Sequence, residues 1–190
     1  VMHHDDPLVL VTDHRISTVE QILPVLELSA REGRPLVIVS EDIEGQALAA
    51  LIMNAMRGTM KVAAIKAPGY GQERRDLLND LATSLGATFV ARDSGNKLQD
   101  VKMVDFGTSK FVESTKNGTI FVGGNSDIET IQSKIESLRA EIETSDSMDE
   151  CNVMQRRITR LASGVAVIRV GGTTEVEMTE RKHRIEDALE

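Results

Sequence analysis

The sequence contains only one cysteine, Cys151, and this scarcity excludes an internal disulfide framework. A chain of 190 residues can bury an ordinary hydrophobic core, so it should fold without covalent crosslinks. The lack of disulfides fits a reducing compartment, and we predict a cytoplasmic location, or the mitochondrial matrix or plastid stroma if the protein is organellar. In such a compartment Cys151 fits a structural thiol better than a reactive one.

Signals for membranes and nucleic acids are also missing. No stretch reaches the roughly 18 apolar residues of a transmembrane helix, and residues 1–6 lack the basic and apolar regions of a signal peptide. The 22 basic residues are outnumbered by 30 acidic ones and form no stripe that could follow a phosphate backbone. We therefore predict a soluble protein without a membrane or nucleic acid partner. Because the sequence ends within a helical pattern, we also expect it to be part of a longer chain.

Short β-branched runs alternate with helical windows in the first half of the sequence. The strand-like runs are residues 7–12, Leu36–Ser40, 61–66 and 87–91, and the helical windows are residues 18–32, 45–57 and 72–85. Such alternation is typical of parallel strands joined by helices. The sequence therefore predicts an α/β layer architecture.

The second half has a different pattern. Two strand-like runs within residues 110–122 flank Asn117 and Gly118, a pair that signals a β-hairpin. Two helices follow, with capping boxes predicted at Ser126 with Glu129 and at Ser147 with Glu150. Their apolar residues recur every three or four positions, so we predict a helical hairpin. The apolar positions are Ile128, Ile131, Ile135, Leu138 and Ile142, then Cys151, Met154, Ile158 and Leu161. A strand at 164–170 and a charged helical end at 179–190 complete the pattern.

The helical window at residues 18–32 carries more apolar residues than a core-facing stripe needs. At about 100° per residue they cover an arc of about 220°, whereas burial requires about 100°. Pro24 would break a continuous helix, so we predict a short turn capped by Ser17 and Glu20 and a helix that begins near Leu23. The window at 45–57 is apolar on nearly every side. Such helices are either buried or present a binding face, and the pattern alone leaves both open.

A Rossmann-like nucleotide-dependent enzyme is the alternative to a binding module. Gly69 and Gly71 lie between a strand and a helix, where backbone amides could face a phosphate. However, Arg74 stands where the dinucleotide fingerprint requires a third glycine, and no G-x-x-x-x-G-K-[ST] sequence occurs. A tight turn explains these glycines better. Residues 3–6 include histidines and aspartates, but we expect a solvated terminus there and no metal site.

Several separated motifs resemble the apical domain of GroEL-type (group I) chaperonins. The resemblance covers nearly the whole chain, is weakest at residues 93–126, and follows the order and near-spacing of the family. The motifs are ILPVLE at 22–27, EDIEGQALA at 41–49, NAMRG at 54–58, KVAAIKAPGYG at 61–71, GVAVI at 164–168, TEVEM at 174–178 and RIEDAL at 184–189.

This resemblance implies a layered β/β/α apical domain with a helical hairpin, over residues 1–165 and without its N-terminal part, followed by a partial intermediate domain over 166–190. In the family the apical domain swivels on a hinge within a double seven-membered ring, and the ring is driven by ATP and Mg²⁺. The implied partners are non-native polypeptides, a GroES-type co-chaperonin and other copies of the chain. The nucleotide loop G-D-G-T-T-T of the family is absent, so we expect no bound cofactor and no ATPase activity in this chain alone.

The resemblance also assigns roles to single residues. Leu23 and Leu26 match contacts of the first substrate-binding helix, and Leu48, Ile52 and Met53 match those of the second. Glu175 matches a residue of an inter-subunit salt bridge, and Asp187 matches an intermediate-domain aspartate that supports attack of water on ATP. The resemblance therefore favours a binding face over simple burial of the two apolar helices.

Overall fold

A six-stranded sheet forms the centre of the structure, a computed structural model that describes residues 2–58, 60–169 and the backbone of 175–177. The strand order is β12-β6-β4-β2-β7, and β8 pairs with the first residues of β2, whereas β7 pairs with the last. The strands are β2 (Leu8–Thr12), β4 (Leu36–Ser40), β6 (Val62–Lys66), β7 (Phe89–Val90), β8 (Gly107–Thr108) and β12 (Glu175–Glu177). The strands β2, β4, β6 and β7 are parallel, which confirms the predicted α/β pattern. The strand predicted over residues 87–91 is shorter, because only two of its residues pair.

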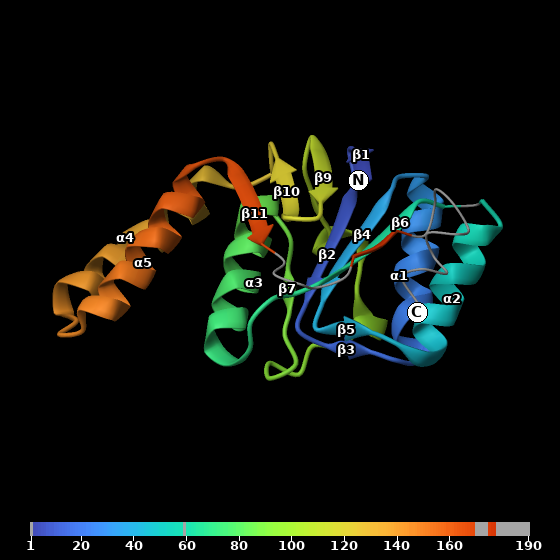
Figure 1. The fold of residues 1–190 in the computed structure, drawn as a ribbon, viewed down its shortest axis with the longest axis horizontal. Coiled ribbons are helices and arrows are strands. Elements are labelled where there is room, and N and C mark those ends of the chain that lie inside the picture. The colour runs from blue at the N-terminus through green and yellow to red at the C-terminus, as the bar shows by residue number, and fades with distance from the viewer. Residues whose placement is uncertain (1, 59, 170–174, 178–190) are drawn as a thin grey trace.

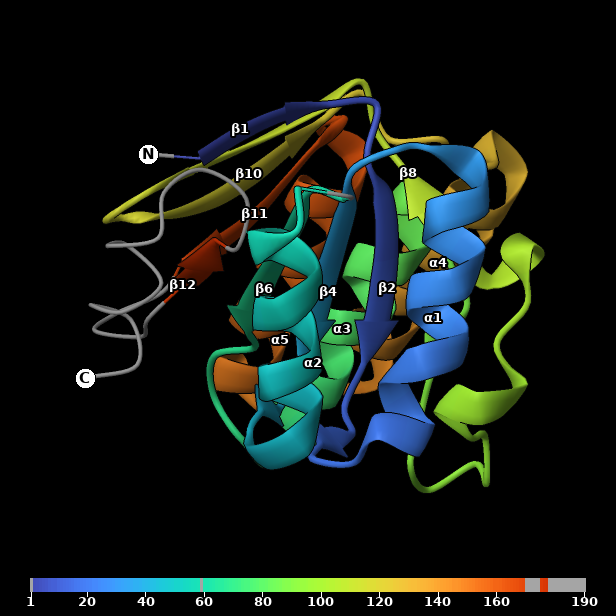
Figure 2. The same ribbon diagram turned by 90° about the vertical axis from the view of Figure 1, so that its right-hand side faces the viewer.

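The two faces of this sheet carry different helices (Figures 1 and 2). Leu8 and Leu10 of β2 face α1 (Val19–Glu32) and α2 (Gly45–Met56), and form one apolar cluster with them. Val9 and Val11 face α3 (Gly71–Leu85) and a second sheet, in a separate cluster. Strands of this kind are buried on both sides, because successive side chains point to opposite faces of a strand.

The second sheet is antiparallel, with the order β1-β9-β10-β11. It contains the predicted hairpin, β9 (Phe111–Thr115) and β10 (Gly118–Val122), together with β11 (Val165–Arg169). Strand β1 (Met2–Asp5) corrects the expectation of a solvated terminus, because it pairs with β9 and buries Met2 and His4. The predicted division between residues 165 and 166 falls within β11 and stays a prediction.

The helical hairpin is confirmed and consists of α4 (Ile128–Thr144) and α5 (Met148–Ala162). Its two apolar seams pack into a small core of their own, from which Ile128 is absent because it is 70% exposed. Ser147 caps α5 as predicted by accepting from the backbone amide of Glu150, but the predicted capping box is not formed, because the backbone amide of Ser147 donates to the Ser145 hydroxyl. Helix α4 is capped by Asp127 rather than Ser126. The Cys151 thiol lies half-buried against the backbone oxygen of Ile142.

A buried cluster of charges fastens this hairpin to α3. The Asp80 carboxylate on α3 accepts two hydrogen bonds from Arg157 of α5, at 2.8 and 3.0 Å, and lies 2.8 Å from the Lys134 ammonium of α4. The hydrogen bonds with Asp80, partly opposed by burial, raise the pKa of Arg157. Two cationic side chains, one from α4 and one from α5, thus meet one carboxylate, and the bidentate geometry of Arg157 fixes orientation.

The first helix also differs from its prediction. Its N-cap is Thr18 rather than Ser17, and Thr18 forms a capping box with Gln21 rather than a pair with Glu20. The helix then continues through Pro24, which costs the bond that a backbone N–H would donate to the carbonyl of Glu20. Burial of the inner face of the helix offsets this loss.

Four shorter elements complete the described part of the chain. Strands β3 (Arg15–Ile16) and β5 (Asp42–Ile43) form a two-stranded parallel sheet below α1 and α2. The 3₁₀ helices are η1 (Leu98–Asp100) and η2 (Met103–Asp105), and η1 packs against α1.

Among the described residues, no helix combines the length and the apolar character that crossing a bilayer would require.

The charge cluster gives a test of how the hairpin is held. Asp80→Ala should lower the free energy of unfolding by about 3 kcal/mol, because it removes the buried carboxylate that the part-buried charges of Arg157 and Lys134 share. Asp76→Ala is the matched control, since Asp76 is more exposed and contacts Arg157 only at 3.6 Å; it should cost less than about 1 kcal/mol. Urea titrations followed by circular dichroism measure both, and equal losses would contradict this account.

Candidate functional site

Helices α1 and α2 lie side by side on one face of the six-stranded sheet and start from a common base (Figure 2). In this base, β3 precedes α1 and β5 precedes α2, and the two strands pair directly. The backbone amide of Ala47, in the first turn of α2, donates to the carbonyl of Ser17 at 3.2 Å. The Arg15 guanidinium lies 3.2 Å from the Glu44 carboxylate, and this hydrogen bond raises the pKa of Arg15. These contacts fix the separation of the first turns of both helices.

Each of the two helices buries its inner apolar residues against the sheet. The buried residues are Ile22, Val25 and Leu26 of α1, and Ala47, Leu51 and Ala55 of α2. The segment after β7 adds a second wall to the same cluster, because Leu98 of η1 and Val101 pack there as well. The unusually wide apolar arc of α1 is therefore partly explained by contacts on more than one side.

The outer apolar residues of both helices remain accessible. Leu23 of α1 is 46% exposed and Met53 of α2 is 54% exposed, while Leu48 and Ile52 are half-buried at the edge of the core. Val19 precedes Leu23 by one helical turn and Met56 follows Met53 by one, and both are exposed. We name these six residues the α1/α2 surface: Val19, Leu23, Leu48, Ile52, Met53 and Met56.

The structure separates the five residues that the sequence groups as contacts. Leu23, Leu48, Ile52 and Met53 reach this surface, whereas Leu26 is only 4% exposed and packs in the core cluster. The resemblance described in the sequence analysis assigned no contact to Val19 or Met56. Their spacing of four and three residues from Leu23 and Met53 is the signal that places them on the same helix faces.

Known proteins are similar to this chain over its whole length. No protein-family profile matches the chain. In contrast, proteins named Chaperonin GroEL align with all 190 residues. The identities are 45% for Wolbachia sp. subsp. Drosophila simulans (strain wRi), 44% for Wolbachia pipientis wMel and 43% for Wolbachia sp. subsp. Brugia malayi (strain TRS).

The whole chain is similar to GroEL chaperonins. The resemblance found in its motifs is therefore confirmed. The chain spans about a third of the length of these curated relatives, 35% for the first and 34% for the third. Two thirds of each GroEL relative thus have no counterpart in this chain.

Two residues singled out by the GroEL resemblance, Glu175 and Asp187, have side chains outside the described part of the structure. Glu175 begins β12 and lies opposite Ile65 of β6 in the antiparallel pair, but its side chain is outside the described part of the structure. Asp187 lies outside the described residues altogether. Their assigned roles stay predictions.

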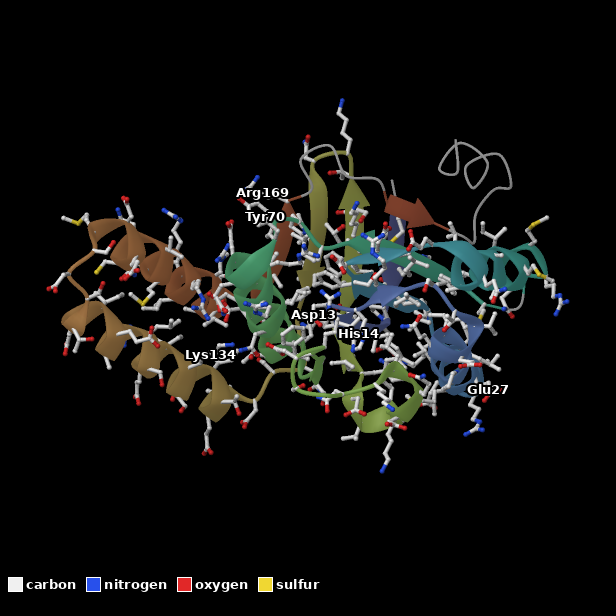
Figure 3. The ribbon with its side chains drawn as sticks, turned by 90° about the horizontal axis from the view of Figure 1, so that it is seen from below. Asp13, His14, Glu27, Tyr70, Lys134 and Arg169 are labelled. Carbon is white, nitrogen blue, oxygen red and sulfur yellow. The ribbon has the colours of Figure 1, made fainter. Side chains whose placement is uncertain are left out.

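The carboxyl edge of the parallel strands is the place where an α/β nucleotide site would be expected. Here the Asp13 carboxylate accepts from the backbone amide of Arg92 at 2.7 Å, and Glu41 lies 3.3 Å from the guanidinium groups of both Arg74 and Arg92. Glu41, Arg74 and Arg92 therefore bind one another at this edge. Figure 3 shows Asp13 and His14 together near the middle of the molecule, apart from Glu27 on α1.

Backbone geometry explains why the turn before α3 contains two glycines. Gly69 and Gly71 have φ angles of 76° and 61°, which residues with a Cβ rarely adopt. Tyr70 between them is the N-cap of α3.

In the described part of the chain, no group of three or more His, Cys, Asp or Glu side chains could hold a metal ion.

The difference between Leu23 and Leu26 predicts different effects on stability. Leu26→Ala should lower the free energy of unfolding by about 2 to 5 kcal/mol, because it opens a cavity in the core. Leu23→Ala, the same substitution one turn away on the same helix, should change it by about 0.5 kcal/mol or less. Paired urea melts measure both, and a comparable loss for Leu23→Ala would show that the side chain is buried in solution.

Proposed function

We propose that this chain is the apical domain of a GroEL-type chaperonin, over residues 1–165, with a partial intermediate domain over 166–190. Its function is to bind non-native polypeptides as part of a protein-folding chaperone. The observation that carries the proposal is the α1/α2 surface, a set of accessible leucine, valine and methionine side chains on two adjacent helices. The similarity to GroEL chaperonins over the whole chain supports it.

The physical basis of this binding is contact between apolar surfaces. Unfolded chains expose apolar side chains that folded proteins bury, and covering them contributes about 25 cal/mol per Å² of apolar area removed from water. Neighbouring apolar ridges on two helices can receive an extended or helical segment without reading its sequence. The flexible thioethers of Met53 and Met56 can adapt to varied partners. A GroES-type co-chaperonin is proposed to use the same surface and thereby compete with the bound polypeptide.

Assembly and ATP hydrolysis belong, in this proposal, to the longer protein. We propose a double seven-membered ring in which Glu175 takes part in a salt bridge between subunits. The chain offers no phosphate-binding loop of the G-x-x-x-x-G-K-[ST] type, so ATP and Mg²⁺ would be held by parts outside it. Asp187 is proposed to support hydrolysis there, because a carboxylate near the γ-phosphate can orient the attacking water.

Polypeptide capture tests the proposed surface. Leu23→Ser and Met53→Ser should each weaken binding of reduced, carboxymethylated lysozyme, which stays unfolded, by about fivefold to thirtyfold, because each removes about 1 to 2 kcal/mol of apolar contact. Binding of a peptide from a GroES-type mobile loop should fall in parallel. Fluorescence anisotropy of the labelled ligands gives both dissociation constants.

Ile128→Ser is the matched control for these variants. Ile128 is a large, exposed apolar residue on α4, which lies on the other side of the six-stranded sheet from α1 and α2 (Figure 1). This variant should bind both ligands as the parent does. Loss of capture in Ile128→Ser, or full capture by Leu23→Ser and Met53→Ser, would place the binding surface elsewhere.

The role proposed for Asp187 requires the full-length protein. Asp187→Ala should slow ATP hydrolysis by about a hundredfold, since the carboxylate acts on the attacking water, while the dissociation constant for nucleotide remains within about twofold of the parent value. Phosphate-release assays and nucleotide titrations separate the two effects. An unchanged turnover rate would reject the assignment.

A further inference from the structure

Two methionine thioethers stand exposed on α2, within the α1/α2 surface. Met53 is 54% and Met56 is 55% exposed, and their spacing of three residues places them on one face of the helix. The other described methionines differ in exposure, and Met60 and Met103 are half-buried against the core cluster of α1 and α2. Met2 of β1 and Met154 of α5 are buried in separate cores, whereas Met148 at the start of α5 is 76% exposed and lies on the distant hairpin.

We propose that Met53 and Met56 form a peroxide-sensitive pair, whose oxidation to methionine sulfoxide releases polypeptide from the α1/α2 surface. This inference rests on the function proposed above and assigns a chemical modification to the same surface. The oxidant is hydrogen peroxide, and the modification leaves the fold of the chain intact.

The reaction is a two-electron oxidation of sulfur. A sulfur lone pair attacks one oxygen of hydrogen peroxide, so that a sulfur–oxygen bond forms while the oxygen–oxygen bond breaks. The departing hydroxide takes the proton left on the transferred oxygen, and the products are one sulfoxide and one water molecule. The sulfur is oxidised and the peroxide is reduced, with no further reactant.

Exposure decides which methionines react. More than half of the surface of Met53 and of Met56 is open to solvent, so peroxide can reach their sulfur atoms in the folded protein. Met2 and Met154 are surrounded by their core clusters, and the chain must open locally before they can be attacked. Under native conditions, peroxide should therefore oxidise Met53, Met56 and Met148 before it oxidises Met2 and Met154.

The consequence for binding follows from the polarity of the product. A sulfoxide is polar, and an apolar partner that covers it removes its oxygen from water without offering a hydrogen-bond donor. The core of the chain does not depend on either side chain, because the clusters contain Leu51 and Ala55 from α2 but neither Met53 nor Met56. Oxidation therefore changes the surface while leaving the helix packed on the sheet.

The test compares binding before and after treatment with peroxide. The chain is treated with hydrogen peroxide, the excess is destroyed with catalase, and binding of reduced, carboxymethylated lysozyme is then measured. The parent chain should bind about tenfold more weakly after treatment. Peptide mass spectrometry should find sulfoxide at Met53 and Met56 before Met2 and Met154, and methionine sulfoxide reductase should restore binding.

Two variants locate the effect. The double substitution Met53→Leu with Met56→Leu keeps apolar side chains of similar volume but removes both thioethers. Its dissociation constant after peroxide should therefore equal its own value before treatment. Met148→Leu removes the exposed methionine of the hairpin, and this variant should stay as sensitive as the parent.

Three outcomes would overturn the inference. Binding of the parent could persist although mass spectrometry shows both sulfoxides, or the double variant could lose binding on treatment. Alternatively, treatment could unfold the parent chain, as seen by circular dichroism. A failure of the proposed function is distinct from these, since the untreated parent chain would then bind no unfolded lysozyme, and the inference would fall with it.

Discussion

Parallel pairing of β2, β4 and β6 is the constraint on which the other parts of the structure depend. Every residue of β2 and β4 is buried, because helices cover one face of this sheet and α3 with the second sheet covers the other. The alternation of side chains along these strands divides the interior into two clusters. That division determines which side of the molecule carries the α1/α2 surface and which side carries the hairpin.

The helices on the two sides are attached by different physical means. α1 and α2 bury some of their apolar residues on the sheet and leave others accessible, so one sequence pattern serves both folding and the proposed binding. The hairpin instead has its own small core and meets α3 through the Asp80 charges. Apolar contact tolerates small displacements, whereas a bidentate ion pair fixes orientation. The hairpin is therefore held at a defined angle without sharing its core with the body.

The sequence predicts the long elements well and the short ones poorly. β4, the β9–β10 hairpin and the helices α2 to α5 follow from apolar periodicity and the Asn117–Gly118 turn. In contrast, β1, β3 and β5 are too short for periodicity to detect, and they pair only because the fold brings distant segments together. The site shows the same limit. Leu23 and Leu26 differ in position by only about 60° around α1, yet only Leu26 is covered, because neighbours from the sheet, α2 and η1 decide its burial.

The pairing of β1 with β9 has a consequence for the order in which the chain acquires its structure. Met2 lies opposite Ser114, so β1 must wait for a partner made about 110 residues later. At about 5 to 20 residues per second, that interval is several seconds or more, far longer than a β-hairpin needs to form. Because β9 and β10 are separated by only a tight turn, they should pair with each other before β1 joins them. Strand β1, although synthesised well before β9, should join the second sheet only after the hairpin has formed.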